Sequence, residues 1–329
     1  MRRYLSAIII AAAALLASCD ALLSAADTQV VSQGSPYELI VVCNQPEWEG
    51  ELGDTLRAVF AEQIPYFAGK EPYFDVLRVT ASGYNKLVVR HRNIFLNVIS
   101  PEIASPSISV AYDVNAAPQI IMTLQGPSAD VNAAFLGENR KSVMQVLESA
   151  ERDRSIDFGR RFSLASLDKL VSERFGVEMK VPQGYTLRQE SEDMLWISYE
   201  YPTASQGFLL YSYPADGISS LEAENLIAAR NRFTKQIPGP TDGSYMTTFM
   251  GYEPDYRAFR LEGRLWCELR GLWDVKGDFM GGPFVSYSTI DTATNRIFTI
   301  DCYVYSPKLG KRNFMRPLEH LIYNIKFVE

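Results

Sequence analysis

The C-terminal half of the chain folds back on itself around residues Leu265–Ser286, which have the sequence LWCELRGLWDVKGDFMGGPFVS. This stretch contains two tryptophans, Trp266 and Trp273, an Arg-Gly pair, a Met-Gly-Gly-Pro segment and two strand-like arms. We expect Met280-Gly281-Gly282-Pro283 to form a hairpin turn with positive φ before a strand that starts at the proline. A ligand-binding glycine loop is the alternative, but the spacing of a phosphate-binding loop is missing and no Lys-Ser/Thr follows.

Apolar periodicity predicts helices and strands on both sides of this stretch. Strands are predicted at 37–43, 74–80, 86–99, 107–112, 119–125, 194–201 and 207–213, with four or five more through Tyr305. Helices are predicted at 52–64, 128–154, 164–175 and 219–236, the last of these with a capping box at Ser219, and near the C-terminus. Runs of strands with helices between them predict the α+β class. We expect two mixed subdomains, 35–160 and 161–329, each a largely antiparallel sheet with flanking helices.

The N-terminus carries a targeting signal. Arg2 and Arg3 precede an apolar run from Ala7 to Leu16 that is too short to span a bilayer. The following Leu16-Ala17-Ser18-Cys19 resembles a bacterial lipobox, which predicts a signal peptide over 1–18, acylation of Cys19 and a tether over 19–34. An ordinary secretory signal that contains a cysteine is the alternative. The acyl chains, at ~0.8 kcal/mol per buried CH₂, would attach the protein to a membrane of the cell envelope. A periplasm-facing anchor is favoured, while Asp20 leaves the choice between inner and outer membrane undecided.

Charge and cysteine content exclude several kinds of partner. Removal of residues 1–18, which contain two arginines and no acid, changes the formal charge from −7 to −9. This acidity argues against nucleic acid and against adhesion to anionic lipid. Three cysteines remain. Cys43 ends an apolar run, whereas Cys267 and Cys302 lie in predicted strands, where a disulfide between them is geometrically possible. No spacing of ligating residues indicates a metal site, and no cofactor is expected.

Two groups of residues are candidate binding sites. Arg270, Trp273 and Asp274 would form a pocket in which the arginine holds an anion and the tryptophan stacks on a ring. Alternatively, Arg270 forms a structural ion pair with a nearby carboxylate, which is common in proteins, and Trp273 fills the core. Basic residues at the start of the last helix would bind an acidic partner or form a solvated face; these are Lys308, Lys311, Arg312 and Arg316.

Candidates for catalysis are few. Glu268, Asp274 and Asp278 would include an acid/base pair if two of them lay roughly 5–10 Å apart, which the sequence leaves open. His91 and His320 are predicted at the surface, and no Gly-x-Ser-x-Gly is present. Four tyrosines lie two residues apart in adjacent predicted strands; these are Tyr199, Tyr201, Tyr211 and Tyr213. They would line one sheet face, where a glycan or peptide could stack on them, or pack in the core.

Short segments spread along the chain resemble the domain-of-unknown-function family 4837, which comprises lipoproteins of Bacteroidetes-type bacteria. The matching segments include 36–42, Trp48 with 53–57, 71–76, 117–119, 195–197, 238–239, 243–247, 270–273, 280–286, 303–307, 311–316 and 318–319. Pro317 departs from the family pattern, so the last helix is expected to begin or kink there. The resemblance implies an envelope location and a fold, and no catalytic residues. From Val181 onward the pattern is also similar to Mog1/PsbP-like α+β sandwiches.

Two functions follow from these observations. The first is a non-enzymatic envelope lipoprotein that binds a protein or a glycan in a groove between its subdomains. The second is an envelope hydrolase that acts on glycan or peptide through paired carboxylates between Glu268 and Asp278. Facing carboxylates in a cleft would favour the hydrolase, and an apolar groove without such a pair would favour the binding module.

Overall fold

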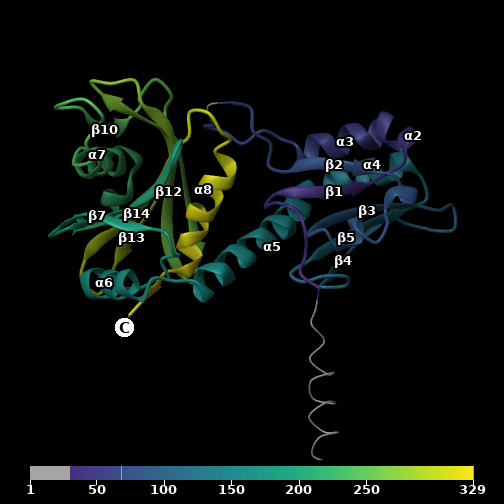
Figure 1. Ribbon diagram of the computed structural model, residues 1–329, viewed down its shortest axis with the longest axis horizontal. Coiled ribbons are helices and arrows are strands. Elements are labelled where there is room, and N and C mark those ends of the chain that lie inside the picture. The colour runs from purple at the N-terminus through teal and green to yellow at the C-terminus, as the bar shows by residue number, and fades with distance from the viewer. Residues whose placement is uncertain (1–29, 68, 329) are drawn as a thin grey trace, which may run out of the picture.

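The computed structural model describes residues 30–67 and 69–328, so the predicted signal peptide and Cys19 lie outside the described residues. Two α+β subdomains lie side by side, and the long helix α5 (Arg140–Arg161) crosses the junction between them (Figure 1). The α+β class with two mixed subdomains is therefore confirmed. None of the helices in the described part is long and apolar enough to cross a membrane.

The N-terminal subdomain contains a five-stranded sheet in the order β2-β1-β3-β5-β4. The strands are β1 (Glu38–Val42), β2 (Asp75–Val79), β3 (Asn93–Ile99), β4 (Ser107–Tyr112) and β5 (Ile120–Gly126). The prediction of a largely antiparallel sheet is wrong for this subdomain, because only β4 pairs antiparallel and the other three pairings are parallel. Helix α3 and the loop that follows it make the crossover between β1 and β2.

Helices cover one face of this sheet. They are α2 (Gln45–Glu49), α3 (Glu51–Phe60) and α4 (Ala129–Glu138), followed by α5. Leu52, Leu56 and Phe60 recur at helical spacing on α3 and pack on Leu39 and Phe95 of the sheet. Val31 and Gln33, within the predicted tether, form single bridges with Ala117 and His91 of this subdomain.

The C-terminal subdomain contains an eight-stranded antiparallel sheet in the order β10-β12-β13-β14-β9-β8-β7, with β11 also paired to β12. The strands are β7 (Thr186–Ser191), β8 (Met194–Tyr201), β9 (Ala204–Pro214), β10 (Tyr245–Thr248), β11 (Asp255–Leu261), β12 (Arg264–Lys276), β13 (Gly281–Asp291) and β14 (Arg296–Tyr305). The short strands β6 (Val177–Glu178) and β15 (Lys326–Phe327) pair separately.

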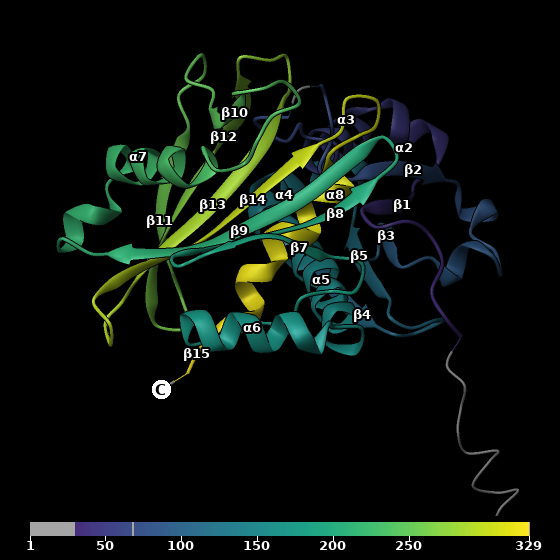
Figure 2. The same cartoon turned by 60° about the vertical axis from the view of Figure 1, so that its left-hand side comes forward.

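Helices cover both faces of this sheet (Figure 2). Helix α7 (Ala223–Thr234) packs on one face, which we call the α7 face. Helices α6 (Ala165–Phe175) and α8 (Arg312–Glu319), together with the 3-10 segment η4 (His320–Asn324), pack on the other face, the α8 face. Gly176 ends α6 in the left-handed conformation at φ 64°, as its sequence position predicts. The predicted capping box at Ser219 is wrong, because α7 begins after Glu222.

Residues Leu265–Ser286 form the hairpin of β12 and β13, but its turn differs from the prediction. The chain reverses at residues 277–280, where Gly277 has φ 93°. Gly281 and Gly282 are paired strand residues opposite Asp274 and Trp273. Gly282 is needed for space, because a Cβ there would lie 2.1 Å from the carbonyl oxygen of Val304.

Strand alternation separates several residues that the sequence groups together. Cys267 packs on the α7 face and Cys302 on the α8 face, so both thiols are free and buried and no disulfide joins them. Tyr211 likewise packs on the α7 face, whereas Tyr199 contacts the core of the α8 face. The four tyrosines therefore do not line one sheet face.

Candidate functional site

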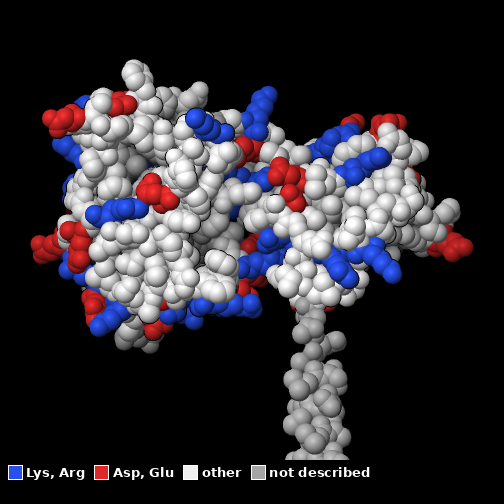
Figure 3. All heavy atoms as spheres, in the orientation of Figure 1, with Lys and Arg blue, Asp and Glu red and all other residues white. Residues whose placement is uncertain are grey.

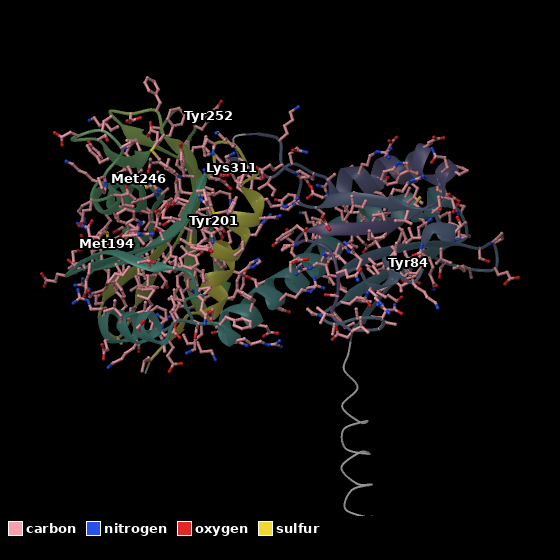
Figure 4. All side chains as sticks on the ribbon, in the orientation of Figure 1. Tyr84, Met194, Tyr201, Met246, Tyr252 and Lys311 are labelled. Atoms are coloured by element: carbon pink, nitrogen blue, oxygen red, sulfur yellow. The ribbon has the colours of Figure 1, made fainter. Side chains whose placement is uncertain are left out.

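A cleft of about 570 Å³ lies between the two subdomains. Helix α5 and the segment at Pro36 and Tyr37 form its N-terminal wall, while β8, β9, α8 and η4 form its C-terminal wall. Its volume lies in the usual range for small-ligand sites in proteins. The lining side chains include Arg92, Glu151, Arg154, Phe158, Lys180, Tyr185, Tyr199, Tyr201, Gln206, Phe314, His320 and Asn324. Figure 4 shows Tyr201 beside α8, at the junction.

Four aromatic rings form a continuous row on the C-terminal wall, which we call the aromatic wall; they are Tyr185, Tyr199, Tyr201 and Phe314. Tyr199 and Tyr201 are two residues apart on β8, so both point to the α8 face, and their ring centroids are 4.3 Å apart. Phe314 on α8 meets Tyr201 edge-on at 5.2 Å. Tyr199, Tyr201 and Phe314 are only partly buried, so ring surface remains accessible to a ligand.

The charges of the N-terminal wall are paired with one another. The carboxylate of Glu151 is almost fully buried on α5 and accepts hydrogen bonds from Arg92 at 2.9 Å and Arg154 at 3.0 Å. The side-chain amide of Asn93 donates to the same carboxylate at 2.6 Å. Lys180, at the edge of the cleft, pairs with Asp168 at 3.1 Å. A ligand therefore meets charges that already have partners.

His320 is a buried polar residue of the cleft that the sequence does not indicate. It was predicted at the surface, as was His91, but the two are only 7% and 8% exposed. Its Nε2 lies 3.2 Å from the hydroxyl of Tyr37, and its Nδ1 has no hydrogen-bond partner among the described residues. Burial lowers the pKa of His320 to about 3 against the opposing attraction of Glu319, so the imidazole is neutral at physiological pH.

Beside the cleft, six side chains of alternating charge form a chain that we call the ion ladder. In order, they are Arg257, Glu268, Arg270, Glu319, Arg316 and Glu148. The ladder begins on β11, passes through β12 and α8, and ends on α5, so it connects the two subdomains. Figure 3 shows charged side chains gathered along this junction.

Burial and ion pairing oppose each other within the ladder. Burial alone would raise the pKa of Glu319, but Arg270 and Arg316 outweigh this effect and lower it to about 2. At the end of the ladder, burial raises the pKa of Glu148 in spite of the attraction of Arg316. Arg270 and Arg316 therefore hold the carboxylate of Glu319 as an ion.

The basic residues of the last helix make a second set of contacts across the junction. One carboxylate oxygen of Glu71 accepts the backbone N–H groups of Lys311 and Arg312 at 2.6 and 2.8 Å, at the N-terminus of α8. The guanidinium of Arg312 also contacts Asp75. An acid at this position offsets the unfavourable placement of cations at a helix N-terminus. The predicted solvated face is therefore wrong: Lys311, Arg312 and Arg316 are buried, and all three contact the N-terminal subdomain.

Arg270, Trp273 and Asp274 do not form one pocket. Arg270 points to the α8 face and belongs to the ion ladder, whereas Trp273 points to the α7 face and is 2% exposed. The indole N–H of Trp273 donates to the carbonyl of Val304 at 3.2 Å. The ring borders a separate cavity of about 580 Å³ with Trp196 and Tyr303. Burial raises the pKa of Asp274.

Glu268 and Asp274, two of the three carboxylates proposed for hydrolysis, are not arranged as a pair. Glu268 is buried between Arg257 and Arg270. Asp274 lies six residues further along the same extended strand, a distance of roughly 20 Å. A glycosidase needs a separation of roughly 5–10 Å. Within the described ranges, His, Cys, Asp and Glu side chains form no group of three or more suited to hold a metal ion.

The fold and cleft define a two-subdomain α+β protein with an aromatic-lined cavity at the subdomain junction. Residues 165–324 match the family model described as domain of unknown function DUF4837, as the sequence resemblance predicts. Residues 32–158 match a second model, domain of unknown function DUF8532. The N-terminal segments on which part of the sequence resemblance rested thus lie in the DUF8532 match.

Similarity to proteins outside these families is slight. No protein among the curated sequences matches this chain. The Ran-binding protein Mog1p of Saccharomyces cerevisiae shares 10% identity over 47% of this chain and 91% of its own, with a TM-score of 0.29. LpqN of Mycobacterium tuberculosis, described as involved in cell envelope biogenesis, shares 14% identity over 46% of this chain and 82% of its own, with a TM-score of 0.28. Scores this low do not establish a common fold.

Proposed function

We propose that this chain is a cell-envelope lipoprotein, anchored through Cys19, that binds an envelope protein or glycan in the cleft between its subdomains. The observation that carries this proposal is the combination of an accessible aromatic wall with His320, a buried neutral side chain whose Nδ1 lacks a partner in the described structure. Aromatic surface with a few placed polar groups is the usual composition of a binding site. The lipobox supports the envelope location.

The cleft is better suited to binding than to hydrolysis. Glu151 is the one carboxylate among the described residues that line it, and this group is already paired with Arg92 and Arg154. A general acid needs a raised pKa and access to the reacting bond. His320 stays neutral down to a pH of about 3 and has only the hydroxyl of Tyr37 within hydrogen-bond distance. The envelope hydrolase that the sequence also suggests therefore finds no acid/base pair in this cleft.

Site-specific photocrosslinking in the native cells tests the proposal. Phe314 in the aromatic wall is replaced by p-benzoyl-phenylalanine, and Tyr252 is replaced in the same way in a matched control. Tyr252 is 64% exposed on a loop outside the cleft. We expect an adduct from position 314, resolved by mass spectrometry, that position 252 does not form. Identical adducts at both positions, or none from a folded chain labelled at 314, would reject the cleft as a binding site.

The anchor is tested separately. Metabolic labelling with an alkyne analogue of palmitate should mark the wild-type protein and leave a Cys19→Ala variant unmarked. The variant should also leave the membrane fraction, because the acyl chains supply most of the attachment. Labelling of the Cys19→Ala variant would contradict the lipobox interpretation.

A further inference from the structure

The polar groups of the cleft restrict the chemistry of its ligand, and this inference rests on the proposed function. The first restriction comes from charge. Arg92 and Arg154 are paired with Glu151, and Lys180 is paired with Asp168. His320 is neutral. A charged ligand would have to displace or compete with these short ion pairs, whereas an uncharged ligand leaves them intact.

The second restriction comes from hydrogen bonding. The tautomer of His320 determines whether its Nδ1 donates or accepts a hydrogen bond. If the hydroxyl of Tyr37 donates to Nε2, then Nδ1 carries the proton and is a donor; if Nε2 donates to Tyr37, then Nδ1 is an acceptor. Nearby amides are mixed. Gln206 and Asn324 use their N–H groups within the protein and keep acceptor oxygens, whereas the amide oxygen of Asn313 accepts from Arg312 and leaves donors. A hydroxyl both donates and accepts, so a ligand rich in hydroxyls can pair with groups of either kind.

The third restriction comes from the aromatic wall. Tyr201 lies between Tyr199 and Phe314, and these rings present partly exposed surface to the cleft. An aromatic face packs well against a flat patch of C–H groups, and its negative face attracts them. A pyranose ring carries such C–H patches on its faces and hydroxyls around its edge.

From these three observations we propose that the cleft binds an uncharged saccharide, with a sugar ring against Tyr201 and Phe314 and hydroxyls toward His320 and the amides. A peptide is the competing ligand, because it also stacks on aromatic grooves. Its backbone donors and acceptors are fixed in position, so it matches a mixed set of partners less readily than hydroxyls do.

The test uses the detergent-solubilised full chain on an array of neutral and acidic oligosaccharides and proline-rich peptides. The neutral set contains hexasaccharides of glucose, mannose, xylose and N-acetylglucosamine, and the acidic set contains hexasaccharides of uronic acids. We expect binding to a neutral hexasaccharide whose Kd is unchanged between 50 mM and 500 mM salt, because no charge is exchanged. Binding confined to acidic sugars, with affinity that falls as salt rises, would overturn the proposal.

Variants place the bound sugar. Tyr201→Leu and Phe314→Leu should each raise the Kd roughly 3- to 10-fold, the usual contribution of one aromatic contact. Tyr201→Phe keeps the ring and should bind like the wild type, as should Tyr252→Ala outside the cleft. Circular dichroism confirms that each variant is folded. If Tyr201→Leu and Phe314→Leu are folded and bind the sugar unchanged, the sugar binds elsewhere and the proposal is wrong.

The outcomes separate this inference from the proposed function. A protein or peptide crosslinked at position 314, without neutral sugar binding, rejects the saccharide and leaves the cleft as a binding site. Absence of both sugar binding and crosslinking rejects both proposals. A glycan adduct at position 314 together with neutral hexasaccharide binding supports both.

Discussion

Replacement of Arg270 by alanine tests the ion ladder most directly. Arg270 contacts Glu268 at 3.4 Å and Glu319 at 2.5 Å, and its side chain is 12% exposed. Removal of one partner from a buried ion pair costs about 3–5 kcal/mol. Here Glu268 keeps Arg257 and Glu319 keeps Arg316, each below 3 Å. We therefore expect the lower end of that range, about 3 kcal/mol of unfolding free energy.

The pKa of Glu319 gives an independent scale for the same interaction. Burial raises this pKa, but Arg270 and then Arg316 bring it down to about 2. Against an ordinary value near 4.5, this corresponds to about 3 kcal/mol for both arginines net of burial. The folded-state pKa is depressed, so the stabilisation is complete above pH 4.5 and is lost as the pH falls toward 2. In the Arg270→Ala variant this acid-dependent loss should shrink.

Urea unfolding followed by tryptophan fluorescence measures both effects, because Trp266 and Trp273 are buried in the C-terminal subdomain. Arg257→Ala is the matched control. It removes the outer ladder arginine, whose side chain is 62% exposed, and should cost less than about 1 kcal/mol. If Arg270→Ala costs no more than Arg257→Ala, the inner ladder does not stabilise the junction.

Two further predictions concern His320 and Gly282. Because burial lowers the pKa of His320 to about 3 while the unfolded chain takes up the proton near pH 6.5, stability should fall as the pH drops from 6.5 toward 3, by at most about 5 kcal/mol. A His320→Gln variant should show a flatter dependence between pH 6.5 and 5, and an unchanged urea-unfolding profile there would disprove this account. Gly282→Ala should cost at least about 2 kcal/mol, since its Cβ would lie 2.1 Å from the Val304 oxygen. A Cβ at Gly137 in α4 would meet open space, so Gly137→Ala should raise the free energy of unfolding by up to about 1 kcal/mol. Thermal melts compare the two variants, and equal effects on stability would refute the packing argument.

Local signals in the sequence locate most elements of the fold. The left-handed Gly176 marks the end of α6, and apolar runs mark β1 and β5. The parallel pairing of β1, β2 and β3 cannot be predicted from the sequence, because the residues of a short strand do not indicate the direction of its partner. The turn before β13 was misplaced because two glycines that are needed for close packing resemble glycines that are needed for positive φ.

The candidate site depends on contacts between distant residues, and these are harder to predict. Tyr37 and His320 are 283 positions apart, and each has an ordinary local sequence. Arg270 was correctly paired with a nearby carboxylate in the structural alternative, yet its second partner, Glu319, belongs to another element. The cations of α8 resemble a solvated face until Glu71 and Glu148 are placed against them. Only Tyr199 and Tyr201, two apart on one strand, offered a local sign of the aromatic wall.

The contacts across the junction determine how the cleft can behave. Its two walls belong to different subdomains, and a hinge motion would pull Arg316 from Glu148 and α8 from Glu71. If exposing these groups costs about 3 kcal/mol, an open state is populated below roughly 1%. The cleft is then preformed, and a ligand binds without having to order its walls. The affinity for the ligand should therefore depend directly on the aromatic wall. The ion ladder should affect binding only by changing the fraction of protein that is folded. A ladder variant that stays folded should bind with wild-type affinity, whereas weaker binding by a folded Arg316→Met variant would show that the walls move.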